Sequence, residues 1–171
     1  MIEAIASSIA VGIKKVVPEH PSSVAVLQYS LALILNGAFI IGLSLLLSII
    51  TGKTAEVAII LISFALLRQV SGGLHLKSGM SCVLVSTGVA TVLSLVNLGQ
   101  TITLTITAIS MLLMLLLAPS NIEKQSRIPK RYYPILKAVS VVIVAVNLLI
   151  QSDVIALAFI AQGITLILTR R

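Results

Sequence analysis

The chain contains a single cysteine, Cys82, and it follows His75 by seven residues. A thiol attacks a carbonyl group well only as a thiolate, and a neighbouring imidazole can produce this form by accepting the proton. On one continuous helix, a separation of seven residues gives about 10.5 Å of axial rise, which is beyond hydrogen-bond reach. The two side chains can therefore react together only if the backbone breaks between them.

The residues around this pair permit such a break. Gly72–Gly73 precedes the histidine and Gly79 follows it, and glycine adopts backbone conformations that are closed to other residues. Ser78 or Ser81 can then cap a helix that begins just before Cys82. In the first turn of that helix, the positive end of the helix dipole favours a thiolate. The spacing therefore allows His75 to act as the base and Cys82 as the nucleophile.

We call residues 68–82 the island, because they form a polar segment between two apolar runs. Arg68 and Lys77 add positive potential, and the absence of Asp and Glu predicts a dyad without a local third acidic member. A structural alternative stays open, since glycine pairs also serve close helix packing. A metal site is not indicated, because His75, Cys82 and the distant His20 are too few ligands for zinc. No cofactor is predicted.

The composition indicates an integral membrane protein. Of the 171 residues, 58% are hydrophobic and 10% are charged, and the mean hydropathy is +1.15. Period-two alternation is absent, so the fold class predicted is all-α. The net charge of +7 does not indicate nucleic acid, because the basic residues lie between apolar runs, where they set orientation and meet anionic lipid or peptide.

The apolar pattern predicts one membrane domain over residues 1–171. Isoleucines at steps of three and four predict an amphipathic interfacial helix over residues 1–17, which Pro18 and Pro21 end. Six membrane-embedded helices follow, at 24–50, 54–70, 80–98, 102–118, 135–150 and 154–169. The second and the fifth are marginal in length and are candidates for re-entrant segments.

Charge placement predicts the orientation. With the amino terminus in the cytoplasm, only Lys53 lies outside, and eleven basic residues lie inside. These eleven are Lys14, Lys15, Arg68, Lys77, Lys124, Arg127, Lys130, Arg131, Lys137, Arg170 and Arg171. The island, the basic segment at residues 119–134 and both termini are therefore expected on the cytoplasmic side.

Arg68, Gly73, His75 and Cys82 form the pattern Arg-x4-Gly-x-His-x6-Cys, with the basic segment further on. This pattern resembles that of the AgrB family of bacterial accessory gene regulator membrane peptidases, and the likeness in size and span layout covers nearly the whole chain. The resemblance implies an endopeptidase of the bacterial cell membrane that cuts a short AgrD-like propeptide and keeps the fragment as a thioester on Cys82. An internal Cys or Ser of the peptide then releases a thiolactone or lactone, the precursor of a quorum-sensing signal.

The resemblance also implies roles for other residues and a homodimeric state. His75 is the implied base, with Arg68 and Gly73 supporting the site beside Gly72 and Ser78. The basic residues that would attract an acidic propeptide tail, or else only fix the topology, are Lys124, Arg127, Lys130 and Arg131.

Two other functions stay open at this stage. A non-enzymatic carrier or peptide exporter would normally have an acidic residue in mid-membrane, but Glu56 and Asp153 are predicted at span edges. A structural membrane subunit would use the small-residue surfaces for association.

Overall fold

The computed structural model of the chain describes residues 1–74, 78–122 and 128–169. The regular elements in these ranges are helices, which confirms the all-α fold class of a polytopic membrane protein. A short 3-10 turn, η2 (Lys130–Tyr132), leads into α6. The α-helices are α1 (Ile2–Val16), α2 (Val24–Thr51), α3 (Thr54–Ser71), α4 (Gly79–Ser94), α5 (Gln100–Leu117), α6 (Tyr133–Ile150) and α7 (Asp153–Thr169).

Helix length separates full spans from shorter elements. Among the described residues, α2, α3, α5 and the segment Lys130–Ile150 are long and apolar enough to cross a membrane. The shorter apolar helices are α4 and α7, with 16 and 17 residues against the 18 residues of α3 and of α5. The sequence had instead indicated α3 and α6 as marginal. The helix α3 continues past Arg68 to Ser71, and η2 extends α6 at its start.

The chain divides into two compact units, and the boundary between them falls inside the island. The first unit contains Met1–Leu47 and His75–Val89, and the second contains Ser48–Leu74 and Ala90–Arg171. The interpretation of residues 1–171 as a single membrane domain stays a prediction.

Three helices meet in the first unit. Ile2, Ala6 and Ala10 form the buried face of α1, whereas Ile5 and Ile9 are more exposed. In this unit Ser44 of α2 donates a hydrogen bond to Thr87 of α4, with 3.4 Å between the hydroxyl oxygens. A small apolar pocket of about 140 Å³ is lined by all three helices, through Met1, Ile2, Ile5, Phe39, Leu43, Met80, Val83 and Leu84.

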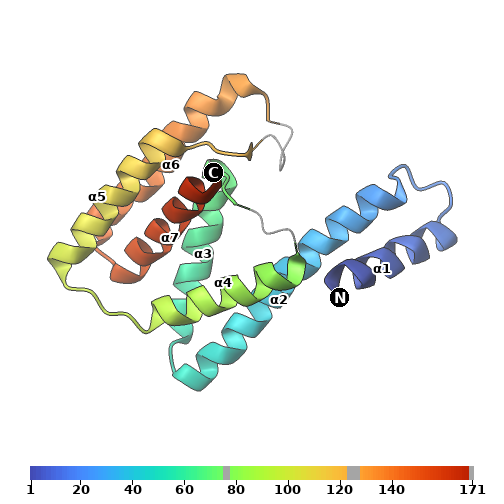
Figure 1. Cartoon of the computed structure of the whole chain (residues 1–171), viewed down its shortest axis with the longest axis horizontal. Coiled ribbons are helices and arrows are strands. Elements are labelled where there is room, and N and C mark those ends of the chain that lie inside the picture. The colour runs from blue at the N-terminus through green and yellow to red at the C-terminus, as the bar shows by residue number, and fades with distance from the viewer. Residues whose placement is uncertain (75–77, 123–127, 170–171) are drawn as a thin grey trace. The chain divides into compact units, whose positions relative to one another are not determined.

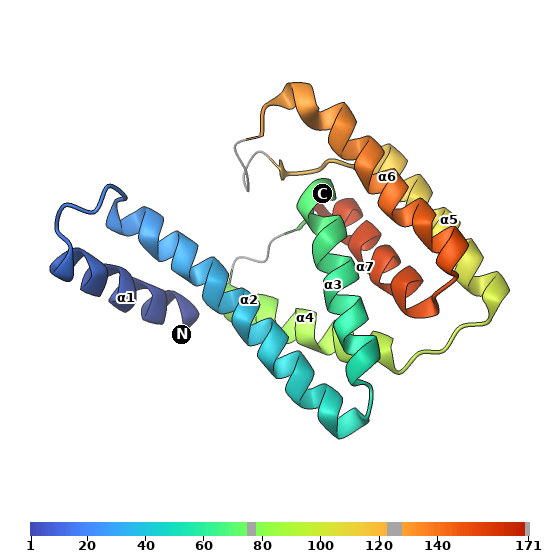
Figure 2. The same ribbon diagram turned by 180° about the vertical axis from the view of Figure 1, so that it is seen from behind.

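The second unit is a bundle of α3, α5, α6 and α7, in which α7 packs on both α3 and α5 (Figures 1 and 2). Gly163 permits the close approach of α7 to α5, because a Cβ atom there would lie 2.7 Å from Leu113 Cδ1. The buried apolar core draws on all four helices and consists of Leu67, Met114, Ala118, Val144, Phe159 and Leu166.

Buried polar side chains also link the helices of the second unit. Asn147 of α6 donates hydrogen bonds to Thr107 Oγ1 of α5 and to the Ser152 carbonyl oxygen, each over 3.0 Å. The Ser152 amide donates back to Asn147 Oδ1 over 3.1 Å. Every polar atom of this amide side chain therefore has a partner, as a buried amide requires.

Candidate functional site

The amino-terminal half of the island, residues 68–74, leaves the helix at the glycine pair. The helix α3 ends at Ser71, and Gly72 and Gly73 have φ values of +73° and +126°. Ser120 then pairs with this segment, because its amide donates to the Ser71 carbonyl (2.9 Å) and its carbonyl accepts from the Gly73 amide (3.0 Å). The backbone break expected at the glycine pair is therefore present, and it is fixed by the segment that follows α5.

Neither glycine leaves room for a side chain. A Cβ atom on Gly72 would lie 2.0 Å from the Ser120 carbonyl oxygen, and one on Gly73 would lie 2.6 Å from Thr165 Oγ1. Since both residues also have positive φ values, which L-residues rarely adopt, the fold requires glycine at both positions.

Arg68 secures the end of the same segment. Its guanidinium group donates a hydrogen bond to the Leu74 carbonyl oxygen, and it lies 5.7 Å from the centroid of the Phe64 ring. The Leu74 carbonyl belongs to the peptide bond that leads into position 75. Arg68 therefore acts on the backbone immediately before the predicted base.

Gln162 of α7 is a further partner of the glycine pair, and the sequence interpretation missed it. This side chain is fully buried, and its Nε2 atom donates to the Gly72 carbonyl oxygen (2.6 Å) and to Ser71 Oγ (2.9 Å). Position 162 carries the sole amide side chain in the apolar run of α7. That isolated amide was the available signal, since a buried amide needs hydrogen-bond partners.

The carboxy-terminal half of the island, residues 78–82, begins a new helix. The helix α4 begins at Gly79, and the Cys82 amide donates to the Ser78 carbonyl oxygen over 3.1 Å. Cys82 is a free, half-buried cysteine in the first turn of α4. The helix start just before the cysteine is therefore present, and the dipole at this end of α4 favours an anion.

An acidic side chain of α1, near the amino terminus, contacts the start of α4. Glu3 Oε1 accepts a hydrogen bond from the Gly79 amide over 2.8 Å, and its other oxygen lies 3.7 Å from the terminal amine of Met1. The bond from Gly79 is the main reason why the pKa of Glu3 is lowered. No sequence pattern connects these residues, which lie 76 positions apart.

Helix periodicity separates Cys82 from the apolar pocket of the first unit. Met80, Val83 and Leu84 line that pocket, and at about 100° per residue Cys82 projects from the opposite side of α4. Val85 shares the side of Cys82 and is 54% exposed. The pocket is therefore not a subsite next to the thiol.

Several predicted site residues lie outside the described residues, namely His75, Lys77, Lys124 and Arg127. Of the remaining basic residues, Lys130 and Arg131 are exposed in η2, and the Arg131 guanidinium group donates to Tyr132 Oη over 3.0 Å. In the described part of the chain, no group of three or more His, Cys, Asp and Glu could hold a metal ion. The structure thus joins Arg68 and the glycine pair to Gln162 and Ser120, and it joins the start of the Cys82 helix to Glu3.

Comparison with models of known protein families shows which family the chain belongs to. The model of the accessory gene regulator B family matches residues 3–168, which is nearly the whole chain. The chain belongs to this family. As a member of the AgrB family, it is a membrane protein with a role in accessory gene regulator propeptide processing, and its substrate is an AgrD-like propeptide. The search of curated proteins found no match, and the search of solved structures also found none.

Proposed function

We propose that this AgrB protein is a cysteine endopeptidase that uses Cys82 as the nucleophile to cleave the propeptide and then promotes cyclisation of the cleaved peptide. The observation that carries the proposal is the position of Cys82 in the first turn of α4, in a chain whose island has the pattern Arg-x4-Gly-x-His-x6-Cys. A thiolate at this helix end is stabilised by the helix dipole.

The proposed reaction has two stages. His75 accepts the thiol proton, the Cys82 sulfur attacks the scissile carbonyl carbon, and the peptide C–N bond breaks as the leaving amine takes the proton from the imidazole. The peptide is then held as a thioester. In the second stage, a thiol or hydroxyl group within the peptide attacks the thioester carbonyl, and the Cys82 sulfur leaves and is reprotonated. A thiolactone or lactone is released, and no oxidant or cofactor is consumed.

The other predicted residues support this reaction by position or charge. In the proposal, Arg68, Gly72 and Gly73 set the backbone before His75, and Ser78, which directly precedes α4, accepts the hydrogen bond from the Cys82 amide. The basic residues attract the acidic propeptide tail from the cytoplasmic side, and they are Lys124, Arg127, Lys130 and Arg131. The cytoplasmic orientation of the site and of both termini and the homodimeric state stay predictions.

The proposal is tested with the full chain in liposomes and an AgrD-like propeptide as substrate. We expect Cys82→Ala and His75→Ala each to abolish cleavage, and wild type to form a thioester that hydroxylamine releases. Ser81→Ala, which changes an exposed neighbour, is the matched control and should retain cleavage. Cleavage that survives in Cys82→Ala would disprove the proposal.

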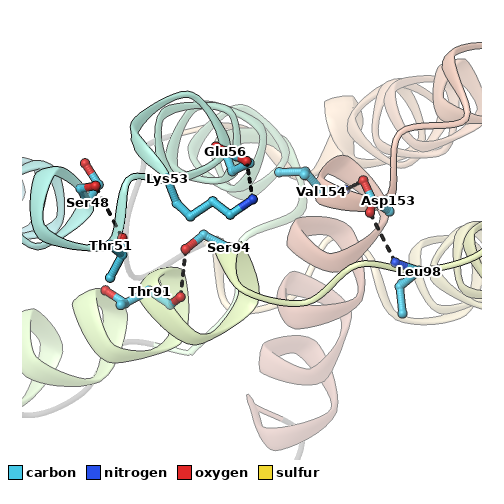
Figure 3. Close-up of polar contacts among 9 residues, drawn as sticks. All are labelled: Ser48, Thr51, Lys53, Glu56, Thr91, Ser94, Leu98, Asp153 and Val154. Carbon is cyan, nitrogen blue, oxygen red and sulfur yellow. Dashed lines mark hydrogen bonds and ion pairs between the residues drawn. The ribbon is translucent and has the colours of Figure 1, made fainter.

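The carrier alternative gains no support from the acidic side chains at the helix ends (Figure 3). Glu56 forms an ion pair with Lys53 over 2.8 Å. Asp153 accepts hydrogen bonds from the amides of Leu98 (3.2 Å) and Val154 (2.8 Å). Both carboxylates therefore have structural roles. Propeptide transport across vesicles by Cys82→Ala would favour a carrier over a peptidase.

A further inference from the structure

We propose that Gln162 is a positioning residue, which fixes the backbone of the glycine pair that leads to the proposed base, His75. This inference rests on the proposed function of the dyad. It assigns a role to a side chain in α7, far from the island in sequence.

The amide group of Gln162 is fully used. Its two Nε2 protons go to the Gly72 carbonyl oxygen and to Ser71 Oγ, and Thr165 Oγ1 lies 3.1 Å from Oε1. The Ser71 hydroxyl donates in turn to the Leu67 carbonyl oxygen over 2.8 Å. Because a carbonyl oxygen can only accept, the nitrogen of the amide must face Gly72, and this sets the orientation of the side chain.

Packing of α7 against α3 does not require an amide. The apolar residues Leu67, Phe159 and Leu166 already form a buried core between these helices. The Gly72 carbonyl oxygen, by contrast, lies beyond the end of α3 and is buried. A buried carbonyl without a donor costs about 1–3 kcal/mol. An apolar residue at position 162 would satisfy the packing and leave this carbonyl unsatisfied.

With the contact of Gln162, every residue from 71 to 74 has a backbone group held by a hydrogen bond. Ser71 and Gly73 pair with Ser120, Gly72 accepts from Gln162, and the Leu74 carbonyl accepts from Arg68. Each backbone residue from 71 to 74 is thereby held, and the next residue is His75. Loss of the Gln162 contact leaves the Gly72 carbonyl oxygen without this donor, while the Gly72 amide still donates to the Arg68 carbonyl oxygen over 2.9 Å and the pairing with Ser120 remains.

The test measures the rate of Cys82 alkylation by iodoacetamide in proteoliposomes as a function of pH. Under the proposed function, His75→Ala should slow alkylation at pH 7 by about tenfold, because the thiol loses the base that accepts its proton. We expect Gln162→Met, which keeps the side-chain length, to shift the pH profile most of the way to that of His75→Ala. A loss of helix packing alone would not move this profile.

Two controls separate positioning from stability. Asn147→Leu removes a fully bonded buried amide elsewhere in the second unit, and it should lower thermal stability without changing the pH profile. Thr165→Val keeps both Gln162 donors but removes the hydroxyl that bonds Gln162 Oε1, so it should lower thermal stability while keeping the wild-type pH profile. Gln162→Asn, which withdraws the donors by one methylene group, replaces Gln162→Met if that variant does not fold, and the same shift is expected.

The outcomes distinguish this inference from the proposed function. A Gln162 variant with the wild-type profile, where wild type and His75→Ala differ, would overturn the positioning role alone. Identical profiles for wild type and His75→Ala would remove the dyad, and the inference with it. An equal shift in Asn147→Leu would also overturn the inference, since the effect would then be one of general destabilisation.

Discussion

The two halves of the island are anchored in different ways. Residues 68–74 belong to the second unit, where their anchors include the fully buried side chain of Gln162 and the backbone of Ser120. Residues 78–82 belong to the first unit, and the contact described at the start of α4 comes from Glu3, whose side chain is 50% exposed. Buried hydrogen bonds open rarely, whereas exposed ones open readily. The approach to His75 is therefore held more firmly than the start of the Cys82 helix.

The largest expected effect comes from breaking the firmly held half at Gly72. Gly72→Ala places a Cβ atom 2.0 Å from the Ser120 carbonyl oxygen at a positive φ. We expect the free energy of unfolding to fall by roughly 2–4 kcal/mol and cleavage to be lost. Denaturant titration and the propeptide assay measure these effects. Gly88→Ala in α4, where no atom lies within 4 Å, is the matched control, and equal losses in both variants would refute the argument.

A smaller effect is expected when Arg68 changes to lysine. Lysine keeps the charge but lacks the planar group that bonds the Leu74 carbonyl oxygen and lies near the Phe64 ring. A hydrogen bond to a charged group contributes about 1.5–3 kcal/mol, so cleavage should slow by at least about tenfold. Single-turnover kinetics at saturating propeptide report this rate. A wild-type rate in Arg68→Lys would show that charge alone is sufficient at this position.

Glu3 contacts the other half of the island, at the start of α4. We expect Glu3→Gln to raise the reactivity of Cys82 modestly, whereas the two preceding variants lower cleavage. It removes a negative charge from the start of α4, so alkylation of Cys82 at pH 7 should become roughly two- to fivefold faster. Because the pKa of Glu3 is lowered in the folded chain, its stabilising contact is complete above the ordinary value of 4.5 and is lost as the pH falls through the lowered value. The difference in thermal stability between variant and wild type should therefore be present at pH 7 and vanish in acid. A difference that persists at pH 2 would contradict this role.

The smallest expected effect is at Ser44. Ser44→Ala removes the hydroxyl that bonds Thr87 over 3.4 Å, and such bonds between membrane helices average about 0.6 kcal/mol. Denaturant titration of the full chain should show a loss of this size, with cleavage unchanged. Ser30→Ala, at an exposed position of the same helix, is the control. A larger loss would mean that the first unit depends on polar contacts as strongly as the second.

Local patterns predicted the helices and the two ends of the island. Uncharged runs located the apolar helices but not which of them are long enough to span a membrane, and Gly72, Gly73 and Gly79 marked the places where the backbone leaves one helix and enters the next. The partners of these residues could not be predicted in the same way. Gln162 and Glu3 lie 90 and 76 positions from the backbone groups that they bond, and no periodicity relates such distant residues. Helix ends were also imprecise, since α4 stops at Ser94 rather than at residue 98.

The ion pair between Lys53 and Glu56 has a consequence for membrane insertion. In the topology expected from the sequence, the turn between α2 and α3 must be translocated across the membrane. Lys53 Nζ and Glu56 Oε1 lie 2.8 Å apart, so their formal charges cancel. A neutral pair crosses a bilayer at a lower desolvation cost than two separate ions. In that expected topology, the pair lowers the barrier to passage of this turn during biogenesis.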